Sequence, residues 1–395
     1  MSDAHSEPSQ KKKWVKRILL ILLILLLVIT LGIGFFIWRA GHTWDSKTEK
    51  FDSITKVDED QAKIKEKLGE AKPLNVTELK APTVTNSDTG KNGTNANGSD
   101  AAAALAANAS EHDKDGDGIL DDGYSYDVVK GPGKNILLLG SDTRSGSEAA
   151  LVSGSRADSI MLMHIPADGK GVYLVSIMRD TWVNIPGYGS AKINAALNYG
   201  GISLQVATVE NLLGIKIDHV AEIEFEGFKA LVNSVDGVDV QVPFNFDINA
   251  WSFKQGMQHM DGGAALAFVR ARYQFADGDY QRVRNQRAFL RGLYNTMKAK
   301  GALSNVGSFQ SAVESIAGYM RVDSGLDAAQ IAQIAAPVLT SGDTTMRMTT
   351  LPNAGPGWSY DGQSIVIVNQ AANANLSYAL QHDSMDQFMA TYGQD

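Results

Sequence analysis

The sequence predicts an α/β fold, a mixed β-sheet sandwiched between helices (α/β/α), preceded by an N-terminal transmembrane helix and a flexible stalk. Three observations predict it. Residues 18–38 form an uncharged apolar run, residues 80–108 are too polar to bury a core, and short apolar runs alternate with helical patterns from residue 124 onward. We therefore divide the chain into an N-terminus (1–17), a membrane span (18–38), a stalk (39–123) and a folded domain (124–395).

The apolar run at 18–38 is long enough to cross a hydrocarbon core of about 30 Å. Five basic residues precede it within the first 17, whereas Arg39 and His42 follow it. The positive-inside rule then places the N-terminus in the cytoplasm and the main domain outside the cell. A cleaved signal peptide would have a shorter apolar region ending in small residues. We predict a single-pass protein of the cell membrane.

The stalk ends in an acidic stretch at residues 113–122. Asp113, Asp115, Asp117 and Asp121 supply hard oxygen ligands around glycines that permit a tight turn, which is the chemistry of a calcium loop. The twelfth position of the loop is Tyr124 rather than a bidentate Glu, so the match to an EF-hand is incomplete. The alternative interpretation is an acidic hinge without a metal.

The domain opens with three strand patterns. Asn135–Leu139, Ser159–Ile165 and Gly171–Ile177 are short apolar runs bounded by turn residues, and a turn at 167–171 joins the last two. Helical periodicity follows at Ser203–Leu213, Phe225–Val235, Asp261–Phe268, Tyr280–Lys298 and, more loosely, Ser308–Leu339. Short β-rich runs lie at His219–Ile223, Val238–Val242, Thr345–Leu351 and Ser364–Val368.

Composition excludes several classes of function. The chain has no Cys, which excludes thiolate zinc sites and Cys nucleophiles. Its 36 basic and 44 acidic residues give a formal charge of −8, which argues against a protein that coats nucleic acid. Motifs for Ser-His-Asp hydrolysis, zinc proteases, P-loops and dinucleotide binding are missing from the sequence.

Arginine and aspartate instead follow the predicted strands. Asp142 and Arg144 come after the first strand, Arg156 and Asp158 lead into the second, and Arg179 and Asp180 end the third. In α/β sheets ligands bind in the crevice beyond strand ends, so these side chains are expected to meet there. A single Arg–Asp pair would be an ordinary surface salt bridge, but three at adjacent strands indicate a site.

A second cluster surrounds the start of the helix predicted at Tyr280–Lys298. Arg270 and Arg272 precede it, Asp277 and Asp279 are candidates to cap it, and Arg282 lies within it. At about 100° per residue, Arg282 and Gln286 share the apolar side of the helix. The opposite side, expected to face solvent, carries Arg284, Arg287 and Arg291. A buried Arg282 requires anionic partners.

Together these residues predict a pyrophosphate clamp. Forked guanidinium groups match phosphate oxygens in pairs, and Mg²⁺, with Mn²⁺ as an alternative, prefers one or two carboxylates together with phosphate oxygens. Asp142 and Asp158 suit the metal. The arginines that suit the anion are Arg144, Arg156, Arg179, Arg270, Arg272 and Arg282.

The motifs in their order resemble the LytR-CpsA-Psr family of cell-envelope proteins. The similarity covers roughly residues 134–293. It includes the Gly-Ser-Asp-x-Arg, Arg-x-Asp-Ser and Ser-Ile-Met-Arg-Asp-Thr segments, Lys192-Ile-Asn-Ala-Ala-Leu-Asn198, and the Arg-x-Arg run that leads to Gly-Asp-x-x-Arg. The chain departs from the family pattern at Met178, where Pro is frequent, and at Asn285, where Arg is usual.

The resemblance implies transfer of a glycopolymer, with its phosphate, from a polyprenyl-pyrophosphate carrier to peptidoglycan or a related wall acceptor, releasing polyprenyl phosphate. It also implies an apolar tunnel for the polyprenyl tail; Leu212, Leu213 and Ile215 fit either its lining or an ordinary core. By motif match, Asp142 and Asp158 would hold magnesium. The pyrophosphate set would be Arg144, Arg156, Arg179, Arg270, Arg272 and Gln286, with Arg179, Asp279 and Arg282 at the reaction centre.

Two alternatives remain at this stage. One is a non-catalytic cell-envelope regulator, although the predicted external location and acidic charge argue against contact with nucleic acid. The other is a protein that binds polyprenyl pyrophosphate, or a pyrophosphatase that transfers to water.

Overall fold

The computed structural model describes residues 44, 46, 48–51, 72–74, 103, 106–107, 109–120, 124–141, 157–301, 320–341 and 345–393. Within these residues, no helix combines the length and the apolar character that a membrane crossing requires. The predicted span at 18–38 lies outside them, as do the site candidates Asp121, Asp142, Arg144 and Arg156.

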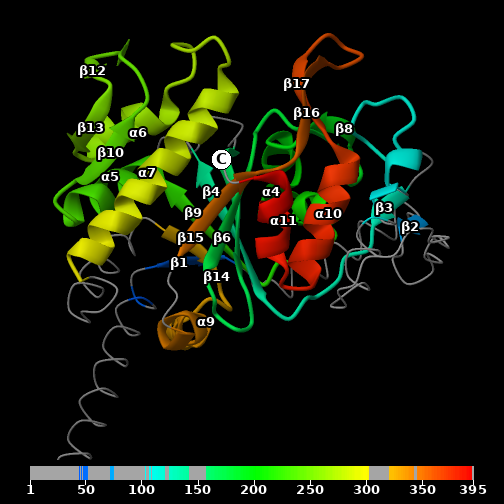
Figure 1. Ribbon diagram of the computed structural model, residues 1–395, viewed down its shortest axis with the longest axis horizontal. Helices are drawn as coiled ribbons and strands as arrows, with labels where there is room; N and C mark the ends of the chain where they lie inside the picture. The colour runs from blue at the N-terminus through cyan, green and yellow to red at the C-terminus, as the bar shows by residue number, and fades with distance from the viewer. Residues whose placement is uncertain are drawn as a thin grey trace, which may run out of the picture.

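A seven-stranded mixed sheet forms the centre of the domain (Figure 1). Its order is β1-β14-β9-β4-β5-β6-β15. Three of its strands confirm the first three sequence predictions, namely β4 (Lys134–Ser141), β5 (Ala157–Ile165) and β6 (Val172–Ile177). The others are β1 (Glu49–Phe51), β9 (His219–Glu224), β14 (Met320–Asp323) and β15 (Met346–Thr350). Successive side chains of β4 and β5 point to opposite faces of the sheet, and most of them are apolar on each face because helices cover both faces.

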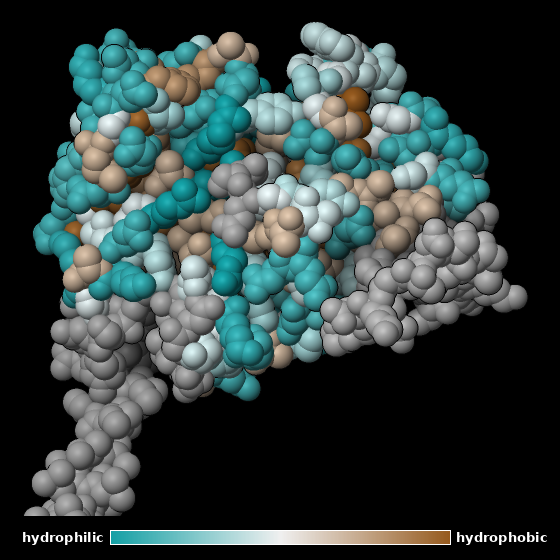
Figure 2. All heavy atoms as spheres, viewed as in Figure 1, coloured by the Kyte–Doolittle hydropathy of each residue, from teal (hydrophilic) through white to brown (hydrophobic). Residues whose placement is uncertain are grey.

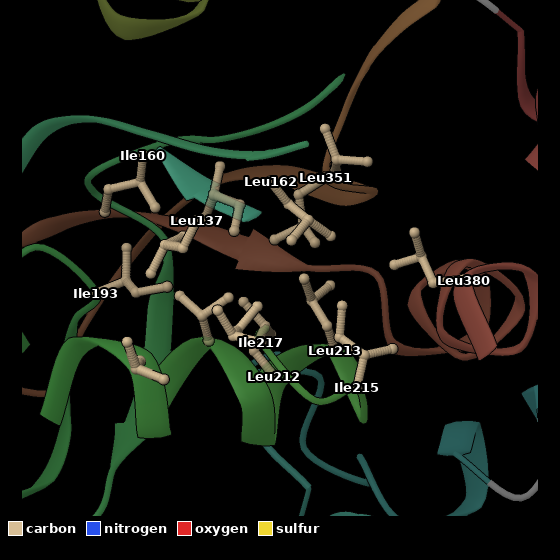
Figure 3. Packing of buried hydrophobic residues seen from close by; sticks show 14 of the residues in the cluster. Leu137, Ile160, Leu162, Ile193, Leu212, Leu213, Ile215, Ile217, Leu351 and Leu380 are labelled. Carbon is tan, nitrogen blue, oxygen red and sulfur yellow. The ribbon is translucent and has the colours of Figure 1, made fainter. Parts of the chain in front are cut away.

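The main core lies between one face of the sheet and three helices, α4 (Ala195–Leu213), α10 (Gln370–Gln381) and α11 (Met385–Tyr392). Figure 3 shows Leu212 and Leu213 of α4 in this core with Leu137 and Leu162 of the sheet. Ile215 belongs to the same buried cluster. At about 25 cal/mol per Å² of apolar area removed from water, such a core is the main source of stability.

The opposite face of the sheet packs on α9 (Ala328–Ser341), through Ile136, Ala221 and Ile334 among others. The α/β/α layering predicted from the sequence is therefore present. The prediction of one loose helix over Ser308–Leu339 is wrong, because β14 occupies Met320–Asp323 and pairs with β9. A four-residue strand is too short to produce a visible period of two.

A second, smaller core lies beside the sheet (Figure 1). Three helices, α5 (Phe225–Ser234), α6 (Gly262–Arg270) and α7 (Asp279–Ala299), pack there with the hairpin of β10 (Val238–Val242) and β13 (Gly256–Met260). A short ribbon, β11 (Phe246–Ile248) with β12 (Trp251–Phe253), completes it. Stacked and tilted rings of Phe246, Phe253 and Phe268 fill the core. This unit carries the start of α7 to the edge of the sheet.

Two hairpins extend the other side of the domain. They are β7 (Trp182–Ile185) with β8 (Gly189–Lys192), and β16 (Asn353–Trp358) with β17 (Ser364–Val368). An isolated bridge between Thr181 and Val366 joins the two hairpins.

Residues that the sequence analysis assigned to the stalk also contact the domain. The indole Nε1 of Trp44 donates to the Leu326 carbonyl at 3.0 Å, and β1 pairs with β14. The side-chain amide of Gln370 donates to the Gly118 carbonyl at 2.7 Å. Gly118 has φ of 81°, and an added Cβ would lie 2.6 Å from the Val368 nitrogen, so only glycine fits there. A parallel pair of β2 (Lys72–Leu74) and β3 (Tyr124–Tyr126) adds to this side.

Candidate functional site

Four strand ends meet at one edge of the sheet. Strand β4 is parallel to β9, β6 is parallel to β15, and β5 runs antiparallel to both β4 and β6. The carboxyl ends of β4, β6, β9 and β15 therefore share an edge with the beginning of β5. Binding residues are expected at such an edge, where the strands leave backbone and side chains open to a ligand.

Arg179 lies two residues beyond β6 at this edge. Its Nη1 donates to Asp158 Oδ1 at 2.6 Å, and Asp158 is the second residue of β5. Its Nε lies 3.9 Å from Asp279 Oδ1 and 4.0 Å from Asp180 Oδ1. The predicted meeting of Asp158 and Arg179 is confirmed.

Asp279 is the first residue of α7 and lies at the centre of the cluster. Gly278, whose φ is 49°, holds the N-cap position, so neither Asp277 nor Asp279 caps this helix with its side chain. Asp279 forms an ion pair with Arg282 one turn later, and Arg272 Nε lies 3.6 Å from its Oδ1. Helical spacing predicted that Arg282 points inward and has an anionic partner. This is confirmed, because Arg282 is only 5% exposed and pairs with Asp279.

Asp180 forms the other half of the cluster. It accepts a hydrogen bond from Arg272 Nη2 at 2.8 Å and lies 3.3 Å from Lys192 Nζ. Its backbone carbonyl accepts from the Val366 amide at 2.9 Å, which ties β17 to the site. The described residues that these ion pairs join are four cations, Arg179, Lys192, Arg272 and Arg282, and three anions, Asp158, Asp180 and Asp279, so the ion-paired set has a net charge of 4 − 3 = +1.

The cluster is incompletely satisfied. Within the described residues, the Nε atoms of Arg179 and Arg282 are buried without a hydrogen-bond acceptor, and both Asp279 oxygens lack a well-aligned donor. Buried guanidinium N–H groups normally find acceptors, so donors left over at an arginine-rich edge suit an anionic ligand with several oxygens.

Burial shifts the pKa values of the central pair in opposite directions. Desolvation raises the pKa of Asp279 above its ordinary value, although Arg282 opposes the shift. Desolvation likewise lowers the pKa of Arg282, and Asp279 opposes it. For Arg179, burial lowers the pKa, but Asp158, Asp180 and Asp279 together outweigh it and the net shift is upward. Asp279 is therefore the carboxylate in this cluster whose proton affinity is enhanced.

Two predicted site residues, Arg270 and Gln286, and two arginines predicted to face solvent are outside the ion-paired set of described residues. Arg270 is exposed at the end of α6, and its guanidinium carbon lies 4.3 Å above the Phe225 ring. Gln286 is half-buried on α7. The expectation that Arg287 faces solvent is wrong, because it is 5% exposed and its Nη1 donates to Thr350 at the end of β15. Arg284 does face solvent and pairs with Asp277.

Sequence reasoning missed Lys192 and Glu224 as members of this edge. Lys192 reaches Asp180 because β8 folds back on β7, and a short Gly-Ser-Ala-Lys strand has no readable period. Glu224 ends β9 and is 7% exposed; no hydrogen bond or ion pair to it occurs within the described residues. Glu224 could have been found from its burial at the end of a strand, but burial cannot be read from the sequence.

The carboxylates fit a divalent cation only in part. Asp158 has Oδ1 bonded to Arg179, which leaves its Oδ2 as the oxygen without a partner in the described part of the chain. Glu224 and Ala157 both pair with Ser141 of β4, so Glu224 and Asp158 lie on strands two spacings apart, about 10 Å between backbones. A hard cation with several waters suits such a set of separated oxygens.

The acidic loop before the domain is well ordered by its own side chains. Asp113 Oδ1 accepts from the Gly118 amide at 3.2 Å, and Asp117 Oδ1 accepts from the Ile119 amide at 2.7 Å. One oxygen from each of Asp113, Asp115 and Asp117 lies within 4.8 Å of the others. Three of the four carboxylates that the sequence predicted for calcium thus lie together, and the fourth, Asp121, is outside the described residues.

Comparison with known proteins places this geometry in a family. The model of the LytR_cpsA_psr family matches residues 92–388. The polyisoprenyl-teichoic acid–peptidoglycan teichoic acid transferase TagU of Bacillus anthracis is 37% identical over 188 residues, 47% of this chain and 60% of that protein. The probable cell wall biosynthesis protein LcpB of Corynebacterium glutamicum is 39% identical over 189 residues, 45% of each chain.

The match spans about 60% of the length of the first of these relatives. The crystal structure of B. subtilis TagV is 26% identical, with a TM-score of 0.54, and covers 65% of this chain and 99% of that one. Both the family match and the mixed sheet agree with the resemblance carried by the arginine and aspartate motifs. The chain belongs to the LytR_cpsA_psr family.

Proposed function

We propose that this protein transfers a glycopolymer, with its phosphate, from a polyprenyl-pyrophosphate carrier to peptidoglycan or a related wall acceptor, and releases polyprenyl phosphate. The observation that carries the proposal is the arginine-rich cluster at the sheet edge, in which buried Arg179 and Arg282 donors have no acceptor among the residues that the structure describes. A diphosphate supplies the missing oxygens. The name of the TagU relative describes the same class of reaction.

The chemistry follows from positioning and charge. Arg179, Arg272 and Arg282 hold the diphosphate oxygens, so that the negative charge that develops on the departing polyprenyl phosphate is stabilised. A hydroxyl of the acceptor attacks the sugar-linked phosphorus. The new P–O bond forms as the bond to the bridging oxygen breaks, and Asp279 accepts the hydroxyl proton. Arg144, Arg156, Arg270 and Gln286 stay predictions as further contacts to the diphosphate.

We propose Mg²⁺ as the cofactor, with Mn²⁺ able to replace it. Asp158 would hold it together with Asp142, and the buried carboxylate of Glu224 lies at the same edge. The ion would supply positive charge to the diphosphate oxygens.

The site is proposed to lie outside the cell. Support comes from the apolar run at 18–38, the basic residues that precede it and the lipid character of the donor.

The raised pKa of Asp279 predicts the pH dependence of transfer. Only the carboxylate accepts a proton, so the rate is expected to fall as the pH drops through the raised pKa of Asp279, which lies above the usual Asp range. The pH profile of kcat/KM checks this. An unchanged rate down to the ordinary pKa of aspartate would remove Asp279 from the role of base.

The direct test uses the full chain in detergent with a polyprenyl-pyrophosphate glycan, a soluble peptidoglycan fragment and Mg²⁺. Mass spectrometry is expected to show the phosphodiester conjugate and an equal amount of polyprenyl phosphate. Release of polyprenyl phosphate without conjugate would instead identify a pyrophosphatase. Binding of the donor without turnover would favour a binding protein or regulator.

We also propose calcium binding at Asp113, Asp115 and Asp117, with Asp121 as a further predicted ligand. Because the loop packs on β17 and α10 through Gly118, calcium is expected to raise the Tm and a chelator to lower it. Calorimetry with and without EDTA measures this. Asp115→Asn should abolish the shift, whereas Asp168→Asn, at an exposed turn far along the chain, should leave it intact. Equal Tm values with and without calcium would indicate an acidic hinge.

A further inference from the structure

Three aromatic side chains beside the cluster are unusually exposed. Among the large hydrophobic residues that the structure describes, Tyr360, Tyr273 and Trp358 have the highest exposed fractions, 90%, 89% and 77%. Aromatic rings usually bury most of their surface, so rings held in solvent mark an interaction surface. We call these three residues the aromatic rim.

The aromatic rim is attached to the site from two sides. Tyr273 follows Arg272, whose guanidinium carbon lies 5.6 Å from the Tyr273 ring and which binds Asp180. Trp358 and Tyr360 lie on the β16–β17 hairpin, and this hairpin is bonded to the site by the Val366 amide, which donates to the Asp180 carbonyl. Figure 2 shows the surface hollowed between the α6–α7 side and this hairpin.

The tip of the hairpin is held in one conformation. The Ser359 amide donates to the Gln363 carbonyl at 2.9 Å, and the Gly362 amide donates to the Ser359 carbonyl at 3.0 Å. The Gln363 side chain donates to Asp361 Oδ2 at 2.7 Å. At the base, the Tyr280 hydroxyl donates to Asn353 Oδ1 at 3.0 Å, which joins β16 to the first turn of α7. Rings presented by a rigid turn lose little entropy when they bind a partner.

The composition of the hairpin indicates which partner fits. Ser359, Asp361 and Gln363 lie between and beside the rings, so the surface is amphipathic rather than continuously apolar, and Figure 2 shows it as pale. A lipid or a protein helix needs a continuous apolar area. A sugar ring presents a face of C–H groups that packs on an aromatic ring and hydroxyls that bond to a polar border.

The charge of the hairpin helps to distinguish the donor polymer from the acceptor glycan of the proposed reaction. Asp361 is the only charged residue between 353 and 368, and the hydrogen bond from Ser359 lowers its pKa, so the hairpin is negatively charged. Asp361 therefore gives the hairpin no attraction for the phosphate of the donor, whereas its charge has little effect on an uncharged sugar backbone.

We propose that the aromatic rim binds the glycan strand of the acceptor, with sugar rings stacked on Trp358 and Tyr360 on one side of the cluster and on Tyr273 on the other. This inference rests on the proposed function for the identity of the strand as acceptor. A strand held at both sides would present a hydroxyl to the diphosphate between them, which raises the effective concentration of the nucleophile.

The test measures binding separately from transfer. Chitohexaose, an uncharged β-linked N-acetylglucosamine oligomer, is titrated into the full chain by calorimetry. Loss of one stacked ring is expected to weaken binding about tenfold, and Trp358→Ala with Tyr360→Ala more than either alone. Trp358→Phe and Tyr360→Phe keep a ring and should retain most of the affinity. Met257→Ala removes an exposed apolar side chain from β13 and should have no effect.

In the transfer assay the same alanine variants should raise KM for the acceptor about tenfold and leave KM for the donor within twofold. Unchanged chitohexaose affinity in the double variant overturns the inference even if transfer occurs. If chitohexaose binds in a way that depends on the rings but no transfer occurs, the aromatic rim is supported and the proposed function is rejected. If the alanine variants lose binding to lipid vesicles but keep binding to chitohexaose, the aromatic rim contacts the membrane and the inference is overturned.

Discussion

Replacing Arg179 with alanine is expected to reduce the rate of glycopolymer transfer by about a hundredfold to a thousandfold. Arg179 lies within 4.0 Å of Asp158, Asp180 and Asp279, and its buried Nε has no hydrogen-bond acceptor in the described part of the chain. Removal of one well-placed donor to a developing negative charge has effects of this size. Transfer is measured by mass spectrometry of the conjugate, and binding of the donor is measured separately.

Arg284→Ala is the matched control. Arg284 lies on the same helix as Arg282 but is exposed and pairs with Asp277, so its loss should change the rate less than twofold. Lys should substitute poorly for Arg179, since an ammonium cannot make paired contacts with a diphosphate. If Arg179→Ala and Arg284→Ala have equal rates, the cluster is not the reaction centre.

Asp279→Asn is expected to abolish transfer, because an amide cannot accept the hydroxyl proton. It should not lower the free energy of unfolding at neutral pH, because burial raises the pKa of Asp279 and the folded protein therefore favours an uncharged group there. Chemical denaturation at constant pH measures the free energy of unfolding. Arg282→Met instead leaves Asp279 without its ion-pair partner and should lower the stability, whereas the double variant Asp279→Asn with Arg282→Met should recover most of it but none of the activity. If Asp279→Asn is much less stable than the unchanged protein, the charge on Asp279 is required for folding.

The same pair predicts how stability depends on pH. The pKa of Asp279 is higher in the folded protein than its ordinary value, so its protonated form favours folding. This contribution is fully present below the ordinary pKa of aspartate and is lost as the pH rises through the raised pKa. Asp279→Asn should therefore flatten the stability profile in that interval.

The strands and the location of the site were predictable, because both depend on short-range sequence signals. Apolar runs ending in Gly140 and Ile177 gave β4 and β6, and Arg179 and Asp180, which directly follow β6, could only lie at the sheet edge. The burial of Arg282 followed from its angular position among apolar residues of α7.

Other features were not predictable. Arg287 lies opposite the apolar stripe, yet it is buried because β15 approaches α7 from that side and the Thr350 hydroxyl accepts a hydrogen bond from it. Helices α10 and α11 cover the main core with alanines and methionines, a pattern too weakly amphipathic to separate from a linker. Strand β1 joins the sheet from a segment whose composition favours an exposed stalk.

The sequence by itself determined the α/β character of the chain, the strand ends that carry its functional groups and the family to which those motifs point, because periodicity and residue type are local properties. Only the tertiary structure decided that Asp180 and Lys192 join Arg179, that Arg270 turns away to Phe225, and that the β16–β17 hairpin and Arg272 both bond to Asp180. The reason is physical: charge pairing and burial depend on distances between segments, and those distances are set by packing of the whole chain.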